Sequence, residues 1–125
     1  MDVLVVDDNE VVADSLAFLL DCYGHRTVVA HEGETALQLL RDGAFELVFL
    51  DENLPGMKGS VVALSLMDRS VSPRPFVVCM TGDSDSNEDF AGLFDVLLHK
   101  PFPLETLMQV IQDARSRDAS TRLAA

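Results

Sequence analysis

The sequence predicts a single α/β domain built as a doubly wound parallel sheet. Five short apolar runs, rich in Val, Leu and Phe and without polar alternation, have the composition of strands covered on both faces. These runs are Val3–Val6, Thr27–Ala30, Leu47–Leu50, Phe76–Met80 and Val96–Leu98. Stretches with helical spacing separate them, and such alternation favours parallel strands joined by right-handed crossovers. A chain of 125 residues is long enough for one core of this kind but not for two.

The segments after the first two runs predict amphipathic helices. The first helix is expected to follow Asn9, a residue type that caps helices, and the second to follow Gly33. Their apolar positions lie about one turn apart, at Leu16, Leu19 and Leu20 in the first and at Ala36, Leu37 and Leu40 in the second.

The fourth helix is the weak element of the pattern. Residues 82–87 after Thr81 have the composition of a loop, and only Glu88–Phe94 remains before the fifth strand. That length allows about two helical turns. We therefore expect the fourth helix to be short or mobile.

The last helix has the clearest pattern. Pro103 suits a first helical turn, and an apolar stripe follows at Leu104, Leu107, Met108 and Ile111. Arg115 and Arg117 suit the negative end of the helix dipole. We expect the domain to occupy residues 1–117 and residues 118–125 to form a frayed C-terminal tail.

Charge and composition exclude several classes of function. The chain has 21 acidic residues against 9 Lys and Arg, for a net charge of −12, so we expect no direct binding of nucleic acid or anionic membrane. No signal peptide or membrane-spanning run is present, which predicts a cytoplasmic protein. The cysteines and histidines lack the spacing of metal ligands; they are Cys22, Cys79, His25, His31 and His99.

Polar side chains follow four of the five predicted strands. Asp7 and Asp8 follow the first, Asp51 the third and Thr81 the fourth, and Lys100 comes just after the fifth. The carboxyl ends of parallel strands meet at one edge of a sheet, where ligands bind in this architecture. We therefore expect these side chains to converge in one crevice.

Each of these residues also has an ordinary structural explanation. Asp7 and Asp8 suit the start of a helix, Asp51 and Thr81 suit turns, and Lys100 suits a solvated surface. Their coincidence at four strand ends is what favours a functional site.

The residue types in this set fit phosphoryl transfer. Clustered carboxylates repel one another unless a cation lies among them, and oxygen ligands of this kind suit Mg²⁺. Lys100 and Thr81 offer a positive charge and a hydroxyl donor for phosphoryl oxygens. A carboxylate can itself be the nucleophile and form an aspartyl phosphate.

As an ordered set, these motifs resemble a response-regulator receiver domain of two-component signal transduction, of the chemotaxis-regulator type. The resemblance covers residues 2–117 and is carried by Val5-Val6-Asp7-Asp8-Asn9, by the segment from Leu50 to Gly59, by Thr81-Gly82 and by Lys100-Pro101-Phe102. It implies a flavodoxin-like (βα)5 fold with sheet order 2-1-3-4-5.

The resemblance also implies a role for each residue. Asp51 would be the phosphoacceptor and would receive its phosphoryl group from a histidine kinase or histidine phosphotransfer protein. Mg²⁺ would be bound directly by Asp8, through water by Asp7, and by Asp51 and the backbone carbonyl of Asn53. Thr81 and Lys100 would hold the phosphoryl oxygens, and the Lys100–Pro101 bond would be cis. Asn53 and Asp83 match positions that tune the lifetime of the phosphorylated state.

Three departures from the family pattern concern output. Leu97 occupies a position where many receivers have an aromatic residue, and Gly82 replaces a more common alanine. The segment from Thr81 to Lys100 is also shorter than usual by about one helical turn. These departures predict intact chemistry and an atypical output.

Three functions remain open from the sequence. The first is a phosphorylatable switch that acts on a downstream protein or an attached output domain; it could be a stand-alone regulator, a phosphorelay shuttle or part of a hybrid kinase. The second is an interaction module that keeps the fold without switching. The third is a Mg²⁺-dependent phosphohydrolase, against which Asp7-Asp8-Asn9-Glu10 lacks the Asp-x-Asp spacing of the common family. We expect no enzyme activity beyond self-phosphorylation and self-dephosphorylation.

Overall fold

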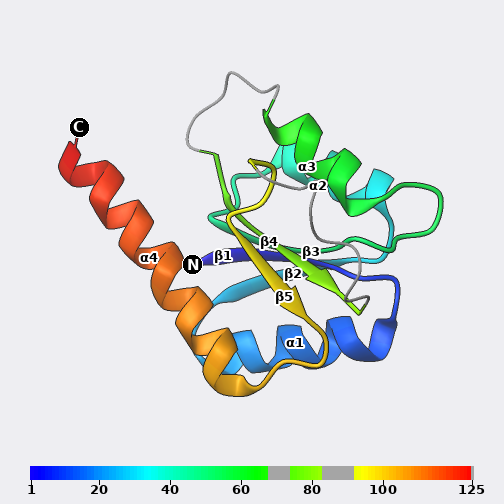
Figure 1. The fold of residues 1–125 in the computed structure, drawn as a ribbon, viewed down its shortest axis with the longest axis horizontal. Coiled ribbons are helices and arrows are strands. Elements are labelled where there is room, and N and C mark those ends of the chain that lie inside the picture. The colour runs from blue at the N-terminus through cyan, green and yellow to red at the C-terminus, as the bar shows by residue number, and fades with distance from the viewer. Residues whose placement is uncertain (68–73, 83–91, 125) are drawn as a thin grey trace.

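A five-stranded parallel sheet forms the centre of the structure, a computed structural model that describes residues 1–67, 74–82 and 92–124 (Figure 1). Its strands are β1 (Asp2–Val6), β2 (Arg26–Ala30), β3 (Leu47–Asp51), β4 (Phe76–Thr81) and β5 (Val96–His99). They lie in the order β2-β1-β3-β4-β5. Each predicted strand is confirmed to within one residue at either end, and so is the sheet order that the resemblance implied.

Four helices are described, two on each face of the sheet (Figure 1). They are α1 (Glu10–Cys22), α2 (Gly33–Asp42), α3 (Gly59–Met67) and α4 (Leu104–Ala124). Helices α1 and α4 cover one face, and α2 and α3 cover the other. The predicted cap of α1 is confirmed, because the Asn9 side chain accepts a hydrogen bond from the Val12 N–H.

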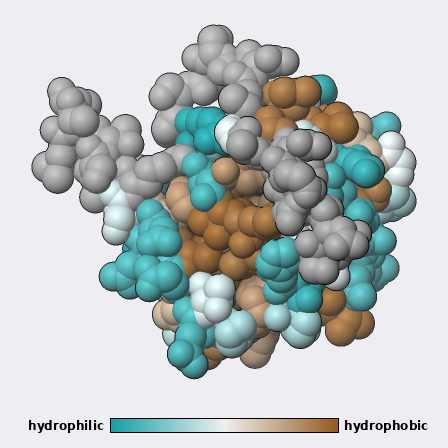
Figure 2. Space-filling view, viewed as in Figure 1, coloured by the Kyte–Doolittle hydropathy of each residue, from teal (hydrophilic) through white to brown (hydrophobic). Residues whose placement is uncertain are grey.

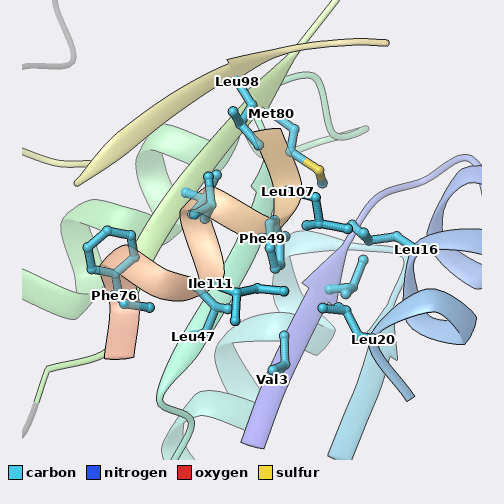
Figure 3. Packing of buried hydrophobic residues seen from close by; sticks show 14 of the residues in the cluster. Val3, Leu16, Leu20, Leu47, Phe49, Phe76, Met80, Leu98, Leu107 and Ile111 are labelled. Atoms are coloured by element: carbon cyan, nitrogen blue, oxygen red, sulfur yellow. The ribbon is translucent and has the colours of Figure 1, made fainter. Parts of the chain in front are cut away.

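Alternation along the strands produces two hydrophobic cores. In β1, Val3 and Val5 face the α1/α4 core, whereas Leu4 and Val6 face the α2/α3 core. Figure 3 shows the first of these cores, in which Phe49 of β3 lies near Leu107 of α4. Because both faces are covered there, β3, β4 and all but the first residue of β1 are buried, as the sequence predicted. The edge strand β2 is less covered, and its Val28 is exposed.

The last helix differs from the prediction in length and in its buried side. It continues through residues 118–124, which we expected to fray, so Arg115 and Arg117 lie inside the helix and not at its end. Leu104 and Met108 are exposed. Over residues 104–116 of α4, for which burial is described, the buried positions are Leu107, Val110, Ile111 and Ala114. The division of the chain at residue 117 stays a prediction.

One face of the molecule shows an apolar area between α4 and β5 (Figure 2). Among the described helices, none is both long enough and apolar enough to cross a membrane. Residues 83–91 lie outside the described part of the chain, and with them lie Asp83 and most of the predicted short fourth helix.

Candidate functional site

The carboxyl ends of the central strands bring three carboxylates together. Asp7 and Asp8 follow β1, and Asp51 ends β3, the strand paired with β1. One oxygen from each of the three side chains lies within 4.8 Å of the others. Asp7 and Asp51 are buried, whereas Asp8 is exposed. The predicted convergence of the three aspartates at one sheet edge is therefore found.

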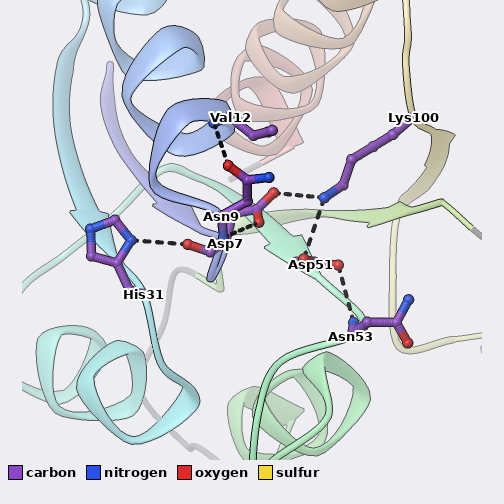
Figure 4. A network of polar contacts seen from close by, with 7 residues as sticks. All are labelled: Asp7, Asn9, Val12, His31, Asp51, Asn53 and Lys100. Carbon is purple, nitrogen blue, oxygen red and sulfur yellow. Dashed lines mark hydrogen bonds and ion pairs between the residues drawn. The ribbon is translucent and has the colours of Figure 1, made fainter.

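Lys100 links the two buried carboxylates (Figure 4). Its Nζ donates to Asp7 Oδ2 at 2.7 Å and to Asp51 Oδ2 at 3.3 Å, although these partners are 93 and 49 residues away in sequence. The Lys100–Pro101 bond that follows β5 is cis, as the resemblance implied.

The second oxygen of each buried aspartate is held by its own loop. Asp7 Oδ1 accepts the Asn9 N–H at 2.9 Å, and Asp51 Oδ1 accepts the Asn53 N–H at 3.0 Å. Both contacts join residues i and i+2, the Asx turn that a strand-ending aspartate readily forms. Each carboxylate is thus fixed with one oxygen on a backbone amide and the other toward Lys100 (Figure 4).

Burial and the mutual repulsion of the carboxylates set the protonation of the site. Burial raises the pKa of Asp51, and so does the charge of Asp7. The hydrogen bond from the Asn53 N–H and the charge of Lys100 lower this pKa, but the net shift is upward. For Lys100, burial lowers the pKa, but the hydrogen bond to Asp7 and the charges of Asp51 and Asp7 outweigh it and leave the pKa raised. Lys100 is therefore firmly cationic, and the cluster still carries more negative than positive charge.

This charge imbalance suits a divalent cation. Three carboxylates face a single ammonium group, and exposed Asp8 opens the cluster to solvent. Mg²⁺ takes one or two carboxylates and keeps several waters, so an oxygen cluster that is partly open to water fits it. Asn53, whose backbone carbonyl is a predicted Mg²⁺ ligand, lies next to the cluster, and its N–H donates a hydrogen bond to Asp51.

The remaining predicted residues lie at or near the same edge. Thr81 ends β4 and is fully buried, and its backbone carbonyl accepts the Lys100 N–H at 2.7 Å. Gly82 is exposed, and no described atom lies within 4 Å of the place where its Cβ would be. Leu97 lies half-buried on β5, paired in register with Cys79 of β4.

Two residues near the site were missed by the sequence analysis. His31 follows β2, so it too lies at a strand end, and its Nδ1 is 3.0 Å from the backbone carbonyl oxygen of Asp7. Glu52 is buried directly after Asp51 and contacts the start of α3. The expectation that polar residues after strands lie at one edge of the sheet could have identified His31. Nothing in the local sequence pattern identifies Ser60 as the partner of Glu52.

Comparison with known sequences gives a consistent result. The family model described as "Response regulator receiver domain" matches residues 3–112. The sensory transduction protein RegX3 of Mycolicibacterium smegmatis is 34% identical over 120 residues, covering 94% of this chain and 51% of that protein. The virulence sensor protein BvgS of Bordetella pertussis is 33% identical over 126 residues, covering 94% of this chain but 10% of BvgS. The chain thus spans about half of the first relative and a small part of the second.

Solved structures show the same fold. The CheY-like receiver domain from Methylobacillus flagellatus superposes with a TM-score of 0.85 at 25% identity and covers 91% of this chain and 98% of that one. The response regulator TrrA of Thermotoga maritima, solved in complex with Mg²⁺-BeF, superposes with a TM-score of 0.82 at 26% identity and covers 90% and 97%.

Proposed function

Since this chain belongs to the response regulator receiver domain family, we propose that it is a phosphorylatable switch in which Asp51 accepts a phosphoryl group. The donor is a histidine kinase or a histidine phosphotransfer protein, and the phosphorylated domain acts on a downstream protein or an attached output domain. Asp7, Asp8, Asp51 and the backbone carbonyl of Asn53 hold Mg²⁺, while Thr81 and Lys100 contact the phosphoryl oxygens.

The observation that supports this proposal best is the Lys100 ion-pair network. One ammonium group lies between two buried carboxylates from different strands, beside a third carboxylate that is open to solvent. A merely structural ion pair needs one carboxylate per lysine. The excess negative charge is costly to fold and is best explained by cations that bind there.

The chain's own residues provide most of what phosphoryl transfer requires. A carboxylate oxygen of Asp51 attacks phosphorus, the phosphorus–nitrogen bond to the donor histidine breaks, and its electron pair returns to the imidazole. Lys100 is already within 3.3 Å of Asp51, so it can follow the charge onto the phosphoryl oxygens. The Asn53 N–H fixes the orientation of the nucleophile. Mg²⁺, when bound, supplies the remaining neutralisation of phosphoryl charge.

A small acyl phosphate tests the chemistry without a cognate kinase. The protein is incubated with Mg²⁺ and the donor, and its mass is followed; one phosphoryl adduct is expected, and Asp51→Asn should abolish it. Because the adduct can hydrolyse quickly, a beryllofluoride complex is the companion measurement. Failure to form either complex, or an adduct that survives Asp51→Asn, would contradict the proposal.

A groove next to the site suits a protein donor. It has a volume of about 520 Å³ and lies between α1 and the segment after β5, with a lining that includes Val11, Leu19, Lys100, Phe102 and Leu104. Lys100 lines the groove and also contacts Asp51, so a phosphohistidine protein seated there would lie next to the site. Val11 is 75% exposed, which leaves this apolar surface free to pack against such a partner.

Leu97 favours a second candidate, the interaction module that does not switch. Its aliphatic side chain lacks the hydroxyl and the flat ring found at this position in many receivers. Backbone amide NMR spectra with and without beryllofluoride separate the two candidates. Shift changes that reach β5 and α4 favour a switch, whereas changes confined to the aspartate cluster favour a module.

The wider protein is also a matter for proposal. The two relatives named above are a sensory transduction protein and a sensor protein. We propose a response regulator or a hybrid-kinase receiver in the cytoplasm, with Mg²⁺ as its cofactor and with no direct role in nucleic-acid or membrane binding.

A further inference from the structure

Glu52 is a buried carboxylate that the proposed chemistry does not use. It is 3% exposed and follows Asp51 directly, yet it does not belong to the carboxylate cluster found among the described residues. Successive residues of a strand point to opposite faces. Phe49 faces the α1/α4 core and Leu50 faces the α2/α3 core, so alternation directs Asp51 to the first side and Glu52 to the second.

On that side, Glu52 meets the first turn of α3. Its Oε1 accepts the Ser60 N–H at 2.8 Å, and its Oε2 accepts the Ser60 hydroxyl at 3.3 Å. Its backbone carbonyl accepts the Gly59 N–H at 3.1 Å. The first amides of a helix have no partner inside the helix, and in α3 the first two both bond to Glu52.

The contact joins three elements closely. The Glu52 N–H donates to the Met80 carbonyl of β4 at 3.0 Å, so this residue is tied to β4 as well as to α3. At Gly59, a Cβ would overlap the backbone carbonyl oxygen of Asp51. The start of α3 is therefore held directly against the end of β3, and residues 53–58 form a loop whose two ends are fixed at the same place.

We propose that Glu52 is a positioning residue for the metal and phosphoryl site. By holding α3 against β3, it fixes the loop that begins at Asn53, whose N–H orients Asp51 and whose carbonyl is a proposed Mg²⁺ ligand. This inference rests on the proposed function. A backbone carbonyl binds a metal well only where its loop is held in place. In other metal sites, residues that hydrogen-bond to the ligands hold them in this way.

Hydrogen-bond geometry, and not the negative charge of Glu52, carries the effect. A glutamine keeps an acceptor for the Ser60 N–H and places an N–H group where it can donate to the Ser60 hydroxyl. A leucine has a similar volume but neither hydrogen bond. Glu52→Gln and Glu52→Leu therefore separate the effect of hydrogen-bond geometry from that of filling space. The matched control is Ser65→Ala, a half-buried change on the same helix that removes only a hydrogen bond within α3.

The test is a titration with MgCl₂ alone, followed by backbone amide NMR shifts, since the chain has no tryptophan to report binding. Glu52→Leu is expected to weaken Mg²⁺ binding by about 10-fold. Glu52→Gln and Ser65→Ala should stay within about two-fold of the unsubstituted protein. If Glu52 were only structural, Glu52→Leu would lower stability and leave the Mg²⁺ affinity of the folded protein unchanged.

Unchanged affinity in folded Glu52→Leu, or equal weakening in Glu52→Gln, would overturn the proposal. Hydrogen exchange of the Ser60 amide in the metal-free protein tests the hold on α3 separately. Exchange should be faster in Glu52→Leu than in the other proteins, and equal exchange in all of them would also overturn it. Absence of Mg²⁺ binding in the unsubstituted protein would instead contradict the proposed function, while the exchange measurement would still decide whether Glu52 holds α3.

Discussion

Removing the charge of Asp8 should stabilise the metal-free protein and remove most of its stabilisation by Mg²⁺. Oxygens of Asp7, Asp8 and Asp51 lie within 4.8 Å of one another. Two unit charges at about 5 Å repel by about 3 kcal/mol where the effective dielectric constant is about 20. Asp8 is exposed, and screening by solvent reduces the net effect of its removal to about 1 kcal/mol.

Asp8 is the informative position because Lys100 compensates the other two carboxylates. Lys100 pairs with Asp7 and Asp51, whereas no ion pair of Asp8 occurs in the described part of the chain. Asp8→Asn therefore removes repulsion without breaking a direct ion pair between described residues. The free energy of unfolding in the absence of metal should rise by about 1 kcal/mol.

Mg²⁺ should make the unsubstituted protein more stable than Asp8→Asn, the reverse of the order without metal. A ligand at ten times its dissociation constant stabilises the native state by about 1.4 kcal/mol, and Asp8→Asn should lose most of this gain. The measurement is urea unfolding followed by circular dichroism with EDTA and with MgCl₂. Asp14→Asn, an equal charge change at an exposed position of α1, is the control. Equal stability of the two variants in EDTA, or an equal gain from Mg²⁺, would refute the reasoning.

Three further predictions test the loop, a buried histidine and the groove. Gly59→Ala should cost about 1–3 kcal/mol of unfolding free energy, because its Cβ would overlap the Asp51 carbonyl oxygen; Gly82→Ala, where the described residues leave room, is the control, and urea midpoints compare the two. Burial first, then nearby positive charges, lower the pKa of His25 from its ordinary 6.5, so the unfolded chain binds the proton more readily and stability should fall as the pH decreases below 6.5. His25→Gln should lack that part of the loss when urea midpoints at about pH 7.5 and about pH 5.5 are compared. Val11→Glu should slow phosphoryl transfer from a phosphohistidine protein by about 10-fold and leave transfer from a small acyl phosphate unchanged; equal slowing of both would remove the groove from the donor interface.

The sequence was a good guide where a local pattern has a single physical solution. A parallel strand covered on both faces is apolar along its length, which located β1, β3 and β4, and shorter apolar runs located the edge strands β2 and β5. All five strands could be located to within one residue at either end. Strand ends in such a sheet share one edge, which located Asp7, Asp51 and Lys100 together.

The sequence was a poorer guide where a local pattern is compatible with several packing arrangements. The predicted apolar stripe of the last helix comprises Leu104, Leu107, Met108 and Ile111. Leu107 and Ile111 are buried, but Leu104 and Met108 are exposed, and Val110 and Ala114 are buried in their place. Helical spacing defines a stripe only to within about one position, and packing against the sheet chooses among the neighbouring stripes.

The amino-acid sequence by itself determined the class of fold and which residue types stand at the carboxyl edge of the sheet, because strand periodicity and the ends of apolar runs are local properties. Only the tertiary structure decided what those residues contact. Asp51 and Glu52 are neighbouring acidic residues, yet one reaches Lys100, 49 positions away, and the other reaches the start of α3. Their partners depend on where β5 and the start of α3 lie relative to the end of β3. Packing of the whole domain decides those positions, and no local pattern does.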